Sequence, residues 1–305
     1  MRFWAGVTDN RWYQFVRRHA FEEVNFWQPS ARAPFTNLPE GTPFLFKLKR
    51  PNHDIAGGGY FVRYTRLPLL TAWEVFGQQN GAETLDAFLS LIQGNRQTPV
   101  SLDTEIGCTV LTDVFYLSEK QWVPAEKLFA PNIMVGRSYD TAVQEDARSL
   151  WSQIQTVELE RTLAKPRLDD ERRFGREFLT QARLGQGSFR TLVIDAYRRK
   201  CAMTGESTLP TLEAAHIRAY AAEGTHQVTN GLLLRSDFHK LFDAGLITVE
   251  PDLRIRVSGR IRDRYFNGKA YYKLDGQQLS SLPADSRDHP NLSLLRWHNE
   301  NRFVA

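Results

Sequence analysis

The chain has 305 residues, a net charge of +4 and a sequence pI of about 9.1, with 42% hydrophobic and 12% aromatic residues. This composition is typical of globular proteins and excludes a disordered chain. A chain of this length predicts two domains and a connector rather than one small core. The two cysteines, Cys108 and Cys201, exclude a disulfide framework. The basic charge is compatible with a polyanionic partner but does not require one.

The N-terminus carries no sign of export. MRFWAGVTDNRW lacks the long apolar core of a signal peptide, and no apolar run reaches membrane-spanning length. We therefore expect a cytoplasmic protein with no membrane contact.

The first 135 residues have a strand-dominated pattern. Residues 3–9 predict a strand, followed by a helix over 10–18 with a polar start at Asp9 and Asn10. Alternating positions predict further strands within 39–50, 56–68 and 106–118, whereas 71–81 and 84–94 have helical spacing that stops at glycine.

Residues 136–184 read as a helical connector rich in arginine. The helical pattern continues towards residue 200, with expected interruptions near Pro166 and over LGQGS (184–188). Residues 161–200 contain eleven Lys or Arg against five Asp or Glu. A solvated helix face and a nucleic-acid contact are both open interpretations of such an excess.

The segment over residues 212–245 contains three of the seven histidines of the chain. LEAAHI predicts a strand ending at His216, and NGLLL predicts a second strand or turn beginning at Asn230. A helix follows, with Ser236 or Asp237 as the expected N-cap and Gly245 as the stop. His239 and Asp243 lie four residues apart, so they share one face of that helix.

An imidazole and a carboxylate placed in this way can share one divalent ion. The ion would neutralise charge on a scissile phosphate, while a separate neutral imidazole takes a proton from water. His239 and Asp243 suit the first role and His216 the second. Asn230 could hold the loop near His216 by bonding to backbone groups. Each feature alone is common in structural roles, and the combined order and spacing favour a site.

These motifs resemble the HNH endonucleases of the ββα-metal type. The resemblance rests on CAMTG (201–205), LEAAHI (212–217), NGLLL (230–234) and HKLFDAG (239–245), within a domain over 185–305. It implies that His216 is the general base, Asn230 the loop-fixing asparagine and His239 a ligand of Mg²⁺ or Mn²⁺. We also expect DNA contacts from the connector and this domain, at Arg183, Gln186, Arg190, Arg218 and Lys240.

The chain departs from this family in two places. Many HNH enzymes have an acidic or histidine ligand just before the base, where this chain has Ala215; Asp243 is expected to replace it, with Glu213 as the second choice. Many relatives hold a structural zinc with paired cysteine motifs, but Cys201 has no such partner, so we expect no structural zinc and a buried Cys201. His226 is assigned a structural or phosphate-contacting role ahead of metal binding.

The front domain more loosely resembles the PUA-like small β-barrels, which include the EVE and SRA-like readers of modified bases. Such domains stack a flipped base between aromatic side chains. The residues of the implied base pocket are Asn25, Phe26, Trp27, Tyr60 and Trp73. Cations at alternate strand positions could form a phosphate-tracking face: Lys47, Lys49, Arg50, Arg63 and Arg66. The alternatives are that these aromatics form a core and that the cations form a solvated strand face.

Together these features predict an α+β protein with a PUA-like barrel over 1–135, a connector over 136–184 and an HNH domain over 185–305. The expected function is that of a modification-dependent, type IV-like restriction endonuclease acting in phage defence on double-stranded DNA that carries 5-methyl- or 5-hydroxymethylcytosine. Two alternatives stay open: a degenerate HNH module that only binds DNA, and an HNH nuclease not directed by base modification. Cutting both strands with one site per chain favours a homodimer.

Overall fold

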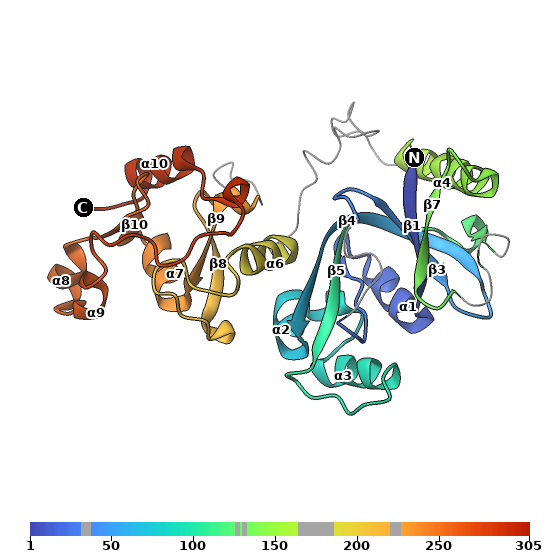
Figure 1. Ribbon diagram of the computed structural model, residues 1–305, viewed down its shortest axis with the longest axis horizontal. Helices are drawn as coiled ribbons and strands as arrows, with labels where there is room; N and C mark the ends of the chain where they lie inside the picture. Colours follow the sequence, from blue (N-terminus) through green and yellow to red (C-terminus); the bar gives the residue numbers. More distant parts are fainter. Residues whose placement is uncertain (32–37, 126–128, 130–132, 164–185, 220–226) are drawn as a thin grey trace. The chain divides into compact units, whose positions relative to one another are not determined.

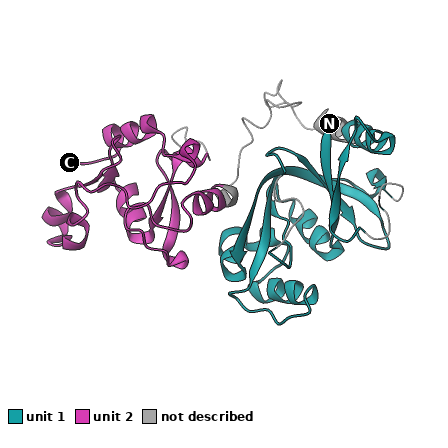
Figure 2. Cartoon of the chain, in the orientation of Figure 1, with its two compact units in different colours: residues 1–182 teal, residues 183–305 magenta. Residues whose placement is uncertain are grey.

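A computed structural model describes residues 1–31, 38–125, 129, 133–163, 186–219 and 227–305. The chain divides into two compact units, Met1–Ala182 and Arg183–Ala305 (Figure 2). Each unit is considered by itself below.

Unit 1 contains a seven-stranded mixed sheet. Its strands run β2-β5-β4-β3-β1-β7, with β6 paired to β4 (Figure 1). All neighbours along this path are antiparallel except β1 and β3, which are parallel. The strand bounds are Arg2–Thr8 (β1), Val24–Asn25 (β2), Pro43–Leu48 (β3), Asp54–Pro68 (β4), Glu105–Tyr116 (β5), Val123–Pro124 (β6) and Gly136–Asp140 (β7).

The strands and helices expected in the first 135 residues are confirmed. The helices of this region are α1 (Asn10–His19), α2 (Leu69–Phe76) and α3 (Leu85–Gly94). The α+β class is therefore correct. The expected closed barrel is not found: in the described part of the chain, no ladder joins the end strands β2 and β7, and the sheet stays open. Closure would require each end strand to find a second partner.

Both faces of this sheet are covered, and successive side chains along a strand point to opposite faces. Phe3 belongs to a buried cluster that includes residues of α4 (Glu145–Leu163), and its ring stacks on Trp151 at 5.6 Å. On β3, Phe46 points to the other face and meets Trp12 of α1 at 5.4 Å. Helix α1 starts at once because the carboxylate of Asp9 accepts the backbone N–H groups of the first turn.

Unit 2 is built around a hairpin and a helix. Strands β8 (Leu212–His216) and β9 (Gly231–Arg235) pair antiparallel and lead into α7 (Ser236–Asp243), as the motif order predicts. Before them lies α6 (Gln186–Ala196), which includes the last three residues of the LGQGS segment. The interruption predicted over this segment is therefore wrong for residues 186–188. The break expected near Pro166 lies outside the described residues.

The N-cap prediction for α7 is wrong. Arg235 occupies the N-cap with extended backbone and no side-chain cap, and Ser236 is already the first helical residue. Asp237 instead forms a bidentate ion pair with Arg235, with both N–O distances at 2.7 Å. Gly245, with φ of +67°, follows the helix as expected. Cys201 is buried as predicted, and its thiol accepts the Arg235 N–H at 3.4 Å.

The rest of unit 2 consists of a second hairpin and three helices that follow α7 in the chain. Strands β10 (Ile247–Val249) and β11 (Ile255–Val257) pair antiparallel in this second hairpin. Three helices follow: α8 (Arg260–Tyr265), α9 (Lys269–Tyr272) and α10 (Leu292–Asn301). His298 of α10 is buried, stacks on Phe242 of α7 at 3.8 Å and bonds to the Thr248 hydroxyl at 2.8 Å. It therefore joins α7, β10 and α10. No helix in the described ranges is long and apolar enough to cross a membrane.

The buried His298 predicts an acid-sensitive unit 2. Burial lowers the pKa of His298 from its ordinary 6.5 to about 4. The unfolded chain therefore binds the extra proton between about pH 6.5 and pH 4, and the free energy of unfolding should fall by about 3 kcal/mol as the pH drops through that window. Urea unfolding of the full chain at several pH values measures this fall. His298→Gln should flatten it, and an equal slope in both proteins would contradict the assignment.

Candidate active site

Three side chains of unit 2 meet where α7 packs against β8. His239 of α7 is 22% exposed, and its Nδ1 lies 2.6 Å from Oε2 of Glu213 in β8. One helical turn on, Asp243 Oδ2 lies 3.4 Å from His239 Nε2. The i, i+4 placement predicted from the sequence thus brings Asp243 to His239, and the strand adds Glu213 from the other side.

The contact with Glu213 fixes the tautomer of His239. Burial acts to raise the pKa of the Glu213 carboxyl, but the hydrogen bonds from His239 and Ser236 and the nearby positive charge outweigh it, so that pKa lies below its ordinary value. An ionised carboxylate can only accept, so Nδ1 must donate. In neutral His239, the Nε2 lone pair then faces Asp243.

This donor set suits a divalent ion. Imidazole and carboxylate groups bind Mg²⁺, Mn²⁺ or Zn²⁺, and two ligands each about 2.1 Å from one ion lie about 3.0–3.4 Å apart. His239 and Asp243 would hold the ion, with Glu213 orienting the ring from behind. Among the described residues, no three His, Cys, Asp or Glu side chains converge on a common point. The reason here is that the two carboxylates contact opposite nitrogens of His239.

Asn230 lies buried just before β9 and closes the turn that follows His216. Its side-chain Oδ1 accepts the Arg218 N–H and its Nδ2 donates to the Arg218 carbonyl, each at 2.9 Å. Both backbone groups of Arg218 are thus held by one side chain. This geometry suits the loop-fixing role expected of Asn230.

His216 is the last residue of β8. Its ring stacks on Phe189 of α6, with centroids 3.8 Å apart and an angle of 11°. Gly231 lies across from His216 in the hairpin, and a Cβ there would meet Val193 of α6 at 2.5 Å. The missing side chain at Gly231 therefore lets α6 approach and support the His216 ring.

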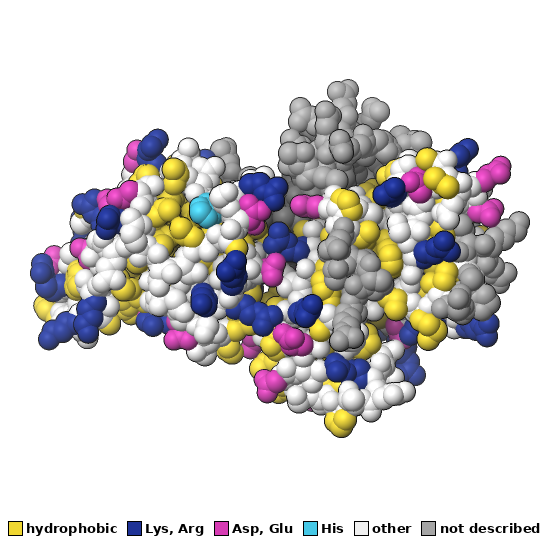
Figure 3. Space-filling model, in the orientation of Figure 1, with side chains coloured by type: hydrophobic (Ala, Val, Ile, Leu, Met, Phe, Trp, Pro, Cys, Tyr) yellow, Lys and Arg dark blue, Asp and Glu magenta, His cyan; other side chains and the backbone are white. Residues whose placement is uncertain are grey.

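The expected DNA contacts fall into three groups. Lys240 is exposed on α7, whereas Arg190 is half-buried in α6. The Arg218 guanidinium lies over the Trp297 ring, 5.0 Å from its centroid. Arg183, the side chain of Gln186 and the ambiguous His226 lie outside the described residues. On the face drawn in Figure 3, lysine and arginine side chains are scattered over both units rather than gathered in one patch.

Unit 1 has an aromatic cavity of about 250 Å³ that includes part of the predicted base pocket. Phe26 and Trp27 line it, and Trp12, missed from the sequence, completes the aromatic wall. Tyr60 on β4 and Trp73 on α2 do not line it. Asn25 is fully buried and donates to Asn80 Oδ1 at 2.9 Å instead.

Asn80 supports this wall from within. It is fully buried, and its backbone carbonyl accepts the Trp27 indole N–H at 2.9 Å. Its side-chain amide donates to the carbonyls of Ala72 and Gly77 at 3.0 and 2.9 Å. Trp27 is therefore oriented by a buried polar group that the sequence did not single out.

Polar residues at the cavity follow two parallel strands. Asp9 comes directly after β1 and Lys49 directly after β3, and the two strands pair in register from Trp4↔Phe44 to Thr8↔Leu48. The carboxyl ends of parallel neighbours meet at one sheet edge, which brings Asp9 Oδ2 within 3.4 Å of Lys49 Nζ. The signal for this site is the parallel pairing, which the periodicity of either strand alone does not reveal.

The predicted phosphate-tracking face of unit 1 needs a correction at Lys47. Lys47 is only 6% exposed because it shares the covered sheet face of Leu45; its ammonium lies 5.2 Å from the Phe129 ring centroid. Burial lowers its pKa. Of the other four, Arg50 and Arg66 are exposed, and Lys49 and Arg63 are half-buried.

Comparisons with known proteins identify one segment of unit 2. Residues 201–250 match the model of the HNH endonuclease family, so this segment is an HNH endonuclease domain. The hairpin, α7 and all three of Glu213, His239 and Asp243 fall within it. No curated protein matches the chain.

Two solved structures are weakly similar in fold. ASCH from Zymomonas mobilis aligns at 14% identity and a TM-score of 0.32, covering 48% of this chain and 94% of that one. The modification-dependent restriction endonuclease TagI aligns at 14% identity and a TM-score of 0.26, covering 91% of this chain and 74% of that one. At these scores the similarity carries no functional conclusion for this chain.

Proposed function

We propose that this chain is a divalent-metal-dependent DNA endonuclease. Unit 1 directs it to DNA by binding a modified base, and a 5-substituted cytosine is the base we propose. The observation that carries the nuclease proposal is the contact of His239 with Glu213 and Asp243 inside the HNH segment. When bound, the ion would stabilise charge on the phosphate and the leaving oxygen.

The chain's own residues have separate tasks in this proposal. His239 and Asp243 hold the ion, Glu213 keeps the Nδ1 proton on His239, and Asn230 shapes the loop after β8. His216 takes a proton from the attacking water at a ring nitrogen. Stacking on Phe189 leaves the ring edge, which bears both nitrogens, as the part that can reach water.

Base reading is supported by the aromatic cavity of unit 1. Trp12, Phe26 and Trp27 supply apolar walls for a flipped base, and Asp9, Gln28 and Asn95 supply polar groups for its edge. The looser PUA-like resemblance of the sequence points the same way. A fully packed aromatic core would offer no such hollow beside polar side chains.

Cleavage of one plasmid in unmodified, 5-methylcytosine and 5-hydroxymethylcytosine forms, with Mg²⁺ or Mn²⁺, tests this proposal. We expect cutting of a modified form only, and Trp27→Ala should lose about 5- to 160-fold of that preference because base stacking is worth about 1–3 kcal/mol. Val143→Ala is the matched control, because Val143 is exposed in the same unit and lines neither cavity. Equal cutting of all three forms would contradict base reading by unit 1. No cutting by the wild type would favour a module that only binds DNA.

A further inference from the structure

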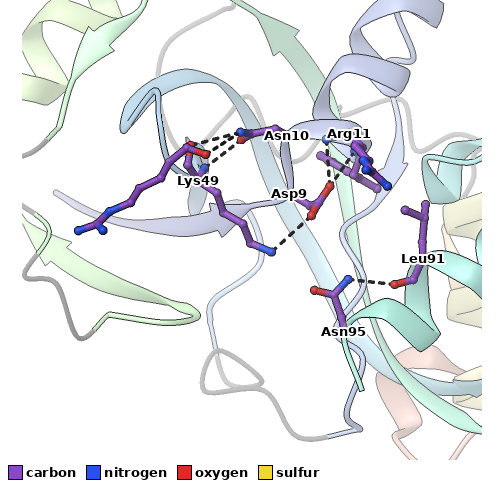
Figure 4. A network of polar contacts seen from close by, with 8 residues as sticks. Asp9, Asn10, Arg11, Lys49, Leu91 and Asn95 are labelled. Carbon is purple, nitrogen blue, oxygen red and sulfur yellow. Dashed lines mark hydrogen bonds and ion pairs between the residues drawn. The ribbon is translucent and has the colours of Figure 1, made fainter. Parts of the chain in front are cut away.

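A second, more polar cavity adjoins the aromatic one in unit 1. It has a volume of about 390 Å³ and shares Asp9, Lys49 and Asn95 with the aromatic cavity. The residues that line it are Asp9, Asn10, Arg11, Lys49, Arg50, Ser90, Leu91, Gly94 and Asn95. Figure 4 shows this region, with Lys49 reaching towards Asp9 and Asn95 nearby. The two cavities therefore lie side by side, with Asp9, Lys49 and Asn95 lining both.

Positive charge predominates in this second cavity. Arg11, Lys49 and Arg50 line it against one carboxylate, Asp9. Asp9 is already compensated: its Oδ1 accepts the backbone N–H of Arg11 at 2.9 Å, and its Oδ2 faces Lys49 Nζ at 3.4 Å. Arg11 and Arg50 are exposed and form no ion pair with any described residue. Two guanidinium groups are thus available to an anion.

The cations of this cavity stand on a fixed backbone. The Asn10 side chain donates to the carbonyls of Lys49 and Arg50 at 3.3 and 3.2 Å, and accepts the Lys49 N–H at 3.0 Å (Figure 4). That amide joins the start of α1, which carries Arg11, to the end of β3, which leads to Arg50. The two arginines therefore come from segments clamped together before any ligand binds.

We propose that this basic cavity binds the DNA phosphate next to the base held in the aromatic cavity. The proposal rests on the proposed base-reading function. Guanidinium groups match phosphate oxygens with paired, charge-assisted hydrogen bonds. A flipped nucleotide brings its own phosphate to the rim of the pocket that takes its base. Arg11 and Arg50 hold that phosphate, and Asp9 and Asn95 at the shared wall face the base.

The test combines one neutralised phosphate with one neutralised arginine. Duplexes carrying a single 5-methylcytosine are made with a normal linkage or with an uncharged methylphosphonate on its 5′ or 3′ side, and their affinity for the full chain is measured without metal. For the wild type, one of the two methylphosphonates should weaken binding about 10-fold. In Arg11→Gln or Arg50→Gln the same methylphosphonate should weaken binding less than about 3-fold, because the charge it met is gone.

Arg18→Gln is the matched control, since Arg18 is exposed on the same helix and lines neither cavity. It should keep the full 10-fold effect of the methylphosphonate. The phosphate site would be overturned if the methylphosphonate weakened binding as much in Arg11→Gln and Arg50→Gln as in the wild type. It would also be overturned if Arg18→Gln reduced the effect of the methylphosphonate as the other two variants do.

The unmodified duplex separates this proposal from the function on which it rests. A preference for 5-methylcytosine without coupling to either arginine leaves base reading in place and removes the phosphate site. Coupling without any preference for 5-methylcytosine keeps the phosphate site and removes modified-base reading. If neither the coupling nor the preference for 5-methylcytosine is observed, both the phosphate site and modified-base reading are contradicted.

Discussion

Replacement of His216 by alanine should slow DNA cleavage by about 10²–10⁴-fold, the usual contribution of a positioned general base. Affinity for DNA should stay near that of the wild type, because the imidazole acts on water rather than on the duplex. Single-turnover cleavage of a modified duplex at saturating protein, beside a separate binding measurement, distinguishes the two effects. Added imidazole should restore part of the rate, since the stacked position beside Phe189 is then vacated.

A matched histidine gives the control for this loss. His289 lies in the same unit, and its Nε2 bonds to the Pro283 carbonyl at 3.1 Å. His289→Ala should cut at close to the wild-type rate. If His216→Ala also cut at that rate, the base would have to be another residue, and the placement of His216 against α6 would be structural.

The nuclease site was predictable because its signals are local. Leu212 to Gly245 form a hairpin and one helix, and the i, i+4 spacing of His239 and Asp243 fixes their shared face without reference to the rest of the fold. The sequence favours Glu213 only as a second-choice ligand. Its contact with His239 depends on how α7 packs on β8, which the spacing within either element does not determine.

The cavities of unit 1 were not predictable in the same way. Asp9 and Lys49 are 40 residues apart in the chain, and they meet because β1 and β3 pair in parallel. Period-2 patterns predict a strand but not its neighbour or direction. Lys47 shows a related limit. Alternation puts it on the same face as Leu45, and its charge predicts that this face is exposed to solvent. In the structure a buried cluster covers that face. Only the packed sheet shows that both faces are occupied.

Replacement of Glu213 by alanine should lower the affinity for Mn²⁺ by about 10–100-fold, as is usual when the partner that orients a metal-binding histidine is lost. Without the carboxylate at 2.6 Å, nothing at that position keeps the proton on Nδ1, and the Nε2 lone pair no longer faces Asp243 in every molecule. Calorimetric titration of the full chain with Mn²⁺, in the absence of DNA, measures the change. Glu300→Ala, an exposed carboxylate on α10, should bind as the wild type does.

Glu213→Gln distinguishes an orienting role from direct ligation. Its amide oxygen can still accept the Nδ1 proton, so an affinity close to that of the wild type would mean that Glu213 acts through His239. A loss as large as that of Glu213→Ala would mean that the negative charge itself acts on the ion, and Glu213 would then be the ligand that replaces the acidic residue missing at Ala215. Wild-type affinity in Glu213→Ala would contradict both roles and leave the ion to His239 and Asp243 alone.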